Sequence, residues 1–149
     1  MKTPSKILND FLIESGTKNI EHSGETLYDH LVGTWSILKK LECSDDVCNA
    51  GLFHSIYGTE VFEPYVISKT QRNDLKNMIG NRSEELVFLF SSLQEPREES
   101  IISFSEPNRS DLMIISFANA LEQLGWCNEL YNMFEPYEHT LPIHRIENL

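Results

Sequence analysis

Apolar residues recur every three or four positions along most of this chain, which is the spacing of an amphipathic helix. One such stripe in residues 26–41 consists of Leu27, Leu31, Thr34, Leu38 and Leu41. A second stripe in residues 44–55 consists of Val47, Ala50, Gly51 and His54. Residues 110–125 are apolar on nearly every side, which predicts a helix at the centre of the fold.

Capping residues, glycines and prolines indicate where the helices begin and end. We expect helices at about residues 3–16, 26–41, 44–55, 68–80, 83–95, 110–125 and 127–135. Two segments lack a helical period: a loop at 56–67, and an irregular connection at 97–108 with room for a short extended piece. The sequence thus predicts an all-α protein, a bundle of about six to seven helices.

The composition fits one globular domain over residues 1–149, with 40% apolar and 23% charged residues. No apolar run approaches the roughly 20 residues of a membrane-spanning helix, and the N-terminal residues show no export signal. We therefore expect a cytoplasmic protein with no membrane partner. The three cysteines form no CxxC pair, so we expect free thiols rather than disulfides or a cysteine zinc site.

The formal net charge of −11 argues against a nucleic-acid partner, because binding a phosphate backbone needs a dense basic surface. A small phosphorylated ligand held by one or two local cations is compatible with this charge. The sequence alone does not indicate an oligomeric state.

Two of the five histidines, His30 and His54, lie on or beside the apolar stripes of consecutive predicted helices. Helices joined by a short turn pack antiparallel, so the start of the first lies beside the end of the second. This arrangement brings the two imidazoles together. Buried ring nitrogens need partners, which a metal ion or a bound anion can supply. The alternative is a hydrogen-bonded pair of core histidines without a ligand.

These residues belong to the segment TLYDHLVGTWSILKKLECSDDVCNAGLFHSIYGTE, which resembles the HD-domain superfamily, named after a metal-binding His-Asp pair. The following QRNDLKNMIGNRSEELVFLF resembles the helical continuation in its guanosine tetraphosphate hydrolase branch. IISFANALEQL is similar to the segment that holds the last metal-binding aspartate. The resemblance covers about residues 22–125 and implies a single HD-like helical domain with a metal-dependent activity.

The chain departs from the HD pattern at two positions. Ser55 stands where the pair has its aspartate, and Asn119 stands where the last aspartate is expected. Carboxylates offset the charge of a divalent cation, so their loss weakens magnesium or manganese sites more than imidazole-rich zinc or iron sites. The resemblance therefore implies a divalent metal (Mn, Fe or Zn) held by His30 and His54, with His22 as a further candidate ligand.

Other polar residues are candidates for the rest of the site. Asn119 and Glu60 are the candidate catalytic residues, and Asp29 and Asp111 are further carboxylates that could replace a missing ligand. Backbone N–H groups and cations at a helix start can hold a phosphate. The candidate substrate-binding residues are Lys69, Arg72, Tyr57 and Ser55. Each has a plain alternative as a solvated or packing residue.

Three functions follow from this reading. The first is an HD-like metal-dependent enzyme that hydrolyses a small phosphate-containing substrate at the His30/His54 pocket, with an iron-dependent oxygenase of the same fold as a variant. The second is a degenerate HD-like module that binds a small molecule or a protein partner, favoured by the neutral Ser55 and Asn119. The third is a purely structural helical interaction protein.

Overall fold

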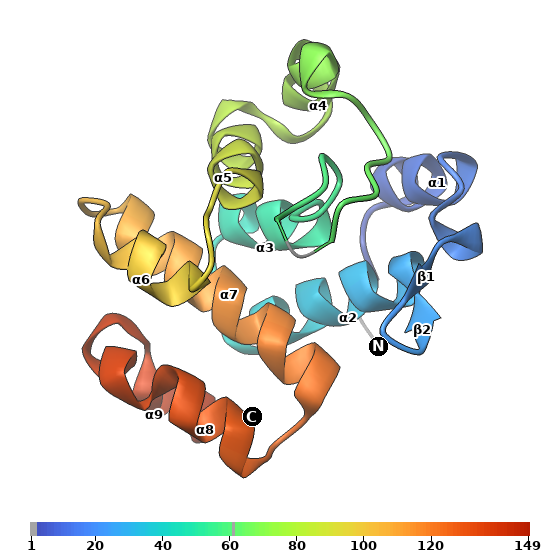
Figure 1. Ribbon diagram of the computed structural model, residues 1–149. Coiled ribbons are helices and arrows are strands. Elements are labelled where there is room, and N and C mark those ends of the chain that lie inside the picture. Colours follow the sequence, from blue (N-terminus) through green and yellow to red (C-terminus); the bar gives the residue numbers. More distant parts are fainter. Residues whose placement is uncertain (1–2, 61) are drawn as a thin grey trace.

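Three helices lie at the centre of the protein: α2 (Leu27–Lys40), α3 (Asp45–Leu52) and α7 (Asn108–Leu124) (Figure 1). The computed structural model describes residues 3–60 and 62–149. Helix α2 packs against both α3 and α7, and α3 also packs against α7. This three-helix arrangement places the start of α2, the end of α3 and the middle of α7 around one interior region.

The remaining elements surround this centre (Figure 1). The outer helices are α1 (Lys6–Glu14), α4 (Arg72–Ile79), α5 (Asn81–Ser91), α6 (Arg97–Ile102), α8 (Asn128–Phe134) and α9 (Ile143–Ile146). Short 3₁₀ turns occur at Thr17–Asn19, Lys69–Gln71 and Glu135–Thr140. Helix α5 packs on α3, while α6 and α8 pack on α7, so the outer helices cover the central three from different sides.

A short hairpin with two residues in each strand precedes α2 and was not expected from the sequence. Strand β1 (Glu21–His22) pairs antiparallel with β2 (Glu25–Thr26). The two residues between them, Ser23 and Gly24, have φ of 49° and 85°. Positive φ at both positions matches a type I′ turn, whose twist suits a tight hairpin. The hairpin returns His22 towards the first turn of α2.

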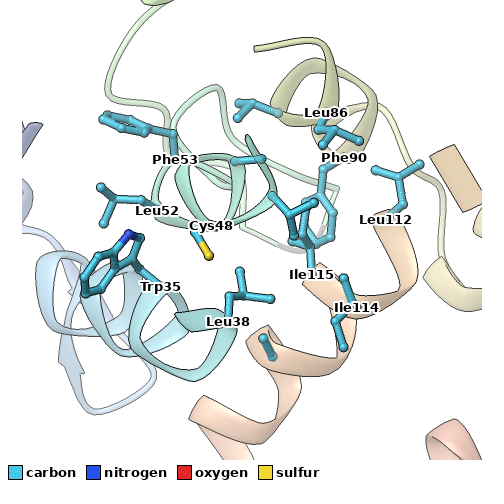
Figure 2. Close-up of a cluster of buried hydrophobic side chains, with 14 of the residues drawn as sticks. Trp35, Leu38, Cys48, Leu52, Phe53, Leu86, Phe90, Leu112, Ile114 and Ile115 are labelled. Carbon is cyan, nitrogen blue, oxygen red and sulfur yellow. The ribbon is translucent and has the colours of Figure 1, made fainter. Parts of the chain in front are cut away.

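The core is made of aliphatic and aromatic side chains from the central helices and α5. Figure 2 shows Leu38, Leu52, Phe90 and Ile115 among the side chains that meet there. Close approach of α2 and α3 depends on Gly51, because a Cβ at this position would lie 2.2 Å from Leu38 Cδ1. A glycine in the stripe of α3 therefore allows the two helices to bring their histidines within reach of each other.

The all-α prediction is confirmed, since the described residues contain nine α-helices and one very short sheet. The number of helices exceeds the six to seven expected, partly because the segment 97–108, expected to be irregular, contains α6. Helix α3 ends at Leu52 rather than near residue 55, so His54 lies in the turn that follows. None of the helices found in residues 3–60 and 62–149 combines the length and hydropathy required to span a bilayer.

Candidate functional site

His30, His54 and Asn119 meet in the interior between α2, the turn after α3, and α7. The Nε2 atom of His30 lies 3.2 Å from Nε2 of His54 and 2.9 Å from Oδ1 of Asn119. All three side chains are buried. The convergence expected from the antiparallel packing of two consecutive helices is therefore confirmed, and the central helix α7 adds the asparagine.

The opposite nitrogen of each ring has its own acceptor. His54 Nδ1 donates to the backbone carbonyl of Gly51 at 2.7 Å. His30 Nδ1 is hydrogen-bonded to the carboxylate of Glu122, which lies one turn beyond Asn119 on α7. A proton on Nδ1 leaves the Nε2 atom of a neutral imidazole with a lone pair. Two lone pairs and an amide oxygen therefore face one another.

Glu122 shares its surroundings with Glu25 of the hairpin. One oxygen of each carboxylate and a ring nitrogen of His30 lie within 4.8 Å of one another, so these three residues could hold a metal ion. Hydrogen bonding with Glu122, followed by burial and the nearby negative charge, raises the pKa of Glu25 to about 7. Burial also raises the pKa of Glu122. The raised pKa values indicate that the two carboxyl groups hold a proton more readily than isolated ones, and a bound cation could replace that proton.

His22 stacks on the ring of His30, with centroids 4.1 Å apart and an interplanar angle of 12°. Burial, together with the neighbouring His30, lowers the pKa of His22 to about 4. Burial likewise lowers the pKa of His30 to about 4 and that of His54 well below its ordinary value. All three imidazoles are therefore neutral at physiological pH, the form in which a histidine binds a metal.

A cavity of about 340 Å³ opens beside these residues. Its wall includes His22, His54, Ser55, Arg97, Ser116 and Asn119. Within residues 3–60 and 62–149, two buried side-chain atoms have no hydrogen-bond partner, His22 Nδ1 and Ser55 Oγ. Both belong to the wall of this cavity. Buried polar atoms are nearly always satisfied, so this pair indicates a place where a ligand or water binds.

Three of the expected substrate-binding residues lie elsewhere. The Arg72 guanidinium is paired with Glu84, with Nε to Oε1 at 2.5 Å and Nη2 to Oε2 at 3.0 Å. The Tyr57 hydroxyl donates to the same carboxylate at 3.1 Å. Lys69 lies over the ring of Phe88. These residues form an ion-pair and packing cluster, outside the described wall of the cavity.

The candidate carboxylates from the sequence also serve local structure. Glu60 is exposed, and its carboxylate accepts a hydrogen bond from the backbone N–H of Glu95 at 2.5 Å. Asp111 is paired with Arg82 at 2.6 Å, and Asp29 is hydrogen-bonded to the threonine that caps α2. Of the expected site residues, the structure thus brings together the three histidines, Ser55 and Asn119, but not Glu60, Lys69, Arg72 or Tyr57.

Three residues in the site, Glu122, Glu25 and Arg97, were not assigned a role from the sequence. Glu122 follows Asn119 by three positions on one helix, which places both on the same face. That spacing was a usable signal. Glu25 and Arg97 enter from the hairpin and from α6, neither of which was expected. Their proximity to the histidines depends on tertiary structure, and no local pattern indicates it.

His30, His54 and Asn119 bring three uncharged donor atoms together. Two imidazole nitrogens and one neutral amide oxygen carry no charge, whereas Mg²⁺ and Ca²⁺ prefer carboxylate-rich oxygen sites. A carboxylate behind a metal-binding histidine orients the ring and raises its basicity. Glu122 occupies this position behind His30.

Comparison with known proteins gives one family. A family model described as "Domain of unknown function (DUF6817)" matches residues 11–95, more than half of the chain. No curated protein and no solved structure matches the chain. The matched region contains His22, His30, His54 and Ser55, whereas Asn119 lies beyond its end.

Proposed function

The chain belongs to the DUF6817 family, whose description assigns it no function, and we propose that it is a metal-dependent hydrolase of a small phosphate-containing substrate. The observation behind this proposal is the facing pair of Nε2 atoms on His30 and His54. When both Nδ1 atoms carry the ring proton, bonded to Glu122 and to the Gly51 carbonyl, the two Nε2 atoms present lone pairs to each other. A cation next to these lone pairs and Asn119 Oδ1 resolves that conflict.

The metal is best placed on the Nε2 side of His30. His54 and Asn119 lie on this side and line the cavity. Glu25 and Glu122 contact the other ring nitrogen and lie outside the described cavity wall. A substrate in the cavity can therefore reach the first position and not the second. The two carboxylates supply negative charge behind the ligand, which compensates in part for the neutral residues Ser55 and Asn119.

Each residue of the cavity then has a defined task. A divalent cation bound there supplies Lewis acidity and a bound water of lowered pKa. His30, His54 and Asn119 hold it, and Glu122 fixes the orientation of the His30 ring. Ser55 Oγ and His22 Nδ1 are buried in residues of the cavity wall and have no partner among the described residues, so a bound water or substrate group that reached them would satisfy them. The resemblance to HD domains supports hydrolysis of a phosphate ester over other metal chemistry.

A second function, a metal-free module that binds a small molecule, is favoured by one observation. Both positions at which the HD pattern has aspartate, Ser55 and Asn119, are neutral. In this case a proton on one Nε2 atom satisfies the pair, the two histidines hydrogen-bond each other, and the cavity binds its ligand without a cation.

Phosphate release separates these two functions. The purified protein is treated with a chelator, reloaded separately with Zn²⁺, Fe²⁺ or Mn²⁺, and assayed against a panel of small phosphate monoesters. The proposed enzyme releases phosphate only when reloaded, and His54→Gln abolishes this release. His144→Gln, a change at an exposed histidine in the C-terminal segment, serves as the matched control and retains it. Hydrolysis that is equal in the chelated protein, or absent with every metal, contradicts the proposal.

A further inference from the structure

Arg97, the first residue of α6, lines the cavity of the histidine cluster. Its side chain is only 14% exposed. Burial lowers the pKa of its guanidinium, and an arginine remains charged even so. A buried cation is expensive unless an anion or several acceptors compensate for it. The structure therefore raises the question of which group is the partner of Arg97.

The guanidinium has few partners within the protein. Its nearest carboxylate oxygen, Glu95 Oε1, is 3.6 Å from Nη2, which is too long for a hydrogen bond. Considering residues 3–60 together with 62–149, no oxygen accepts a hydrogen bond from this guanidinium. By contrast, Arg72 and Arg82 each donate two or more short hydrogen bonds to carboxylates and amides. Arg97 thus keeps its donors available on the side of the cavity.

Phe90 holds the guanidinium close to the histidines. The ring of Phe90 is buried and contacts His54 edge-on, with centroids 5.3 Å apart. The guanidinium carbon of Arg97 lies 4.6 Å from the centroid of the same ring, a cation–π contact. One aromatic ring therefore separates the cation from a candidate metal ligand. Arg97, His54 and Ser55 all line the same cavity, so an anion bound there would lie near all three.

We propose that Arg97 binds the phosphate group of the substrate and that the cavity accepts a single phosphate rather than a polyphosphate. This inference rests on the proposed function, and it assigns to Arg97 the role that the sequence suggested for Lys69 and Arg72. The planar guanidinium offers a fork of donors to two phosphate oxygens. His22 and Ser55 belong to the same wall, and each has one buried polar atom, Nδ1 and Oγ, without a partner among the described residues.

The restriction to one phosphate follows from the charges around Arg97. The remaining charged groups of the described wall are Glu95, Glu98 and Glu129. A second or third phosphate would lie next to these carboxylates, and like charges in a shared cavity repel. The part of the substrate beyond its phosphate is therefore neutral, or carries a positive group such as an amine.

Binding of inorganic phosphate tests the role of Arg97. Calorimetry on the purified protein, with the metal content of each sample measured in parallel, compares the parent with Arg97→Gln, Arg97→Lys and Lys69→Gln. We expect Arg97→Gln to raise the Kd for phosphate by about tenfold to a hundredfold, because the variant loses charge-assisted hydrogen bonds to the ligand. Arg97→Lys keeps the charge but loses the paired donors of the guanidinium, so we expect its Kd to lie between those of the parent and of Arg97→Gln. Lys69→Gln removes the same charge outside the cavity and leaves the Kd unchanged.

The outcomes are distinguishable. An Arg97→Gln variant that keeps the parent's metal content, its thermal unfolding and also its phosphate affinity overturns the inference, while the proposed hydrolase stands. A parent that takes up no Zn²⁺, Fe²⁺ or Mn²⁺ and whose phosphate binding still requires Arg97 supports the inference and overturns the proposed hydrolase. Tripolyphosphate is the comparison ligand. If the protein binds tripolyphosphate more tightly than phosphate and this binding depends on Arg97, the restriction to one phosphate is overturned. Weaker binding of tripolyphosphate supports the restriction. A parent that binds no phosphate overturns the inference as a whole.

Discussion

At the scale of single residues, the two ring nitrogens of each histidine have different tasks. Nδ1 of His54 is held by the Gly51 carbonyl, and Nδ1 of His30 by the Glu122 carboxylate. The two Nε2 atoms then face each other, and His30 Nε2 also contacts Asn119 Oδ1. In the proposed enzyme, a bound cation would replace the direct contact between these two nitrogens.

Ser55→Asp tests whether the neutral position next to His54 limits metal binding. The serine hydroxyl is buried without a partner and lines the cavity, so a carboxylate at this position adds negative charge beside the metal. We expect the affinity for Mn²⁺ to rise by about tenfold or more, because Mn²⁺ favours carboxylate ligands. Titration of the chelated variant with Mn²⁺ measures this change. An affinity equal to that of the parent contradicts the placement of the metal at the Nε2 side of His30.

The pH dependence of stability in metal-free protein has two opposing parts. His22 has a pKa of about 4 in the folded state, below its ordinary 6.5, so the unfolded chain binds the proton first and acidification through this range destabilises the fold. Glu25, with a pKa raised to about 7, has the opposite effect, because the folded state binds its proton first.

Denaturant unfolding between about pH 7 and 4 measures how steeply the free energy of unfolding falls with pH. Two variants should change this slope in opposite directions. His22→Gln is expected to weaken the loss of unfolding free energy on acidification, and Glu25→Gln to steepen it. The comparison uses slopes, since each substitution also alters stability at neutral pH. Identical slopes in the parent and both variants would show that these two groups do not have the assigned pKa values.

At the scale of elements, the site depends on how closely the central helices approach one another. Gly33 on α2 faces Glu122 on α7, and Gly51 on α3 faces Leu38 on α2. The register of His30 and His54 was predictable, because the apolar stripes of two consecutive helices fix it. The contribution of the hairpin was not predictable, because β1 and β2 are only two residues each, too short for a period-two pattern to be recognised.

Gly33→Ala tests the contact between α2 and α7. A Cβ at this position would lie 2.8 Å from Glu122 Cγ, so the carboxylate must move away from His30. We expect zinc affinity to fall by about tenfold to a hundredfold, which is typical when a residue that orients a metal-binding histidine is lost. Alanine stabilises a helix relative to glycine by roughly 0.5–1 kcal/mol, so unfolding of the metal-free variant should not show a matching loss. Chelator competition measures the affinity.

Ser36→Ala is the matched control for this substitution, a change to alanine on the same helix one turn further along. Its zinc affinity should equal that of the parent. If Gly33→Ala also leaves the affinity unchanged, Glu122 does not support the metal site through His30.

At the scale of the whole molecule, the cavity combines parts that lie far apart in the sequence: the β1 hairpin, the turn after α3, the start of α6 and the middle of α7. The family match at residues 11–95 ends before Arg97, Asn119 and Glu122. Sequence patterns could identify His30, His54 and Asn119 because each lies in a helix or directly after one whose apolar stripe can be recognised. They could not identify Arg97, since the segment 97–108 has no helical period and its start is placed by packing on α7.

Elemental analysis of protein purified without added metal tests the central claim most directly. The comparison includes the parent, His30→Ala, His54→Gln and the control His144→Gln. The account predicts a near-stoichiometric divalent ion in the parent and the control, and its loss from both site variants. A parent that contains no metal and takes up none from Zn²⁺, Fe²⁺ or Mn²⁺, or a His54→Gln protein that retains the ion, would contradict it.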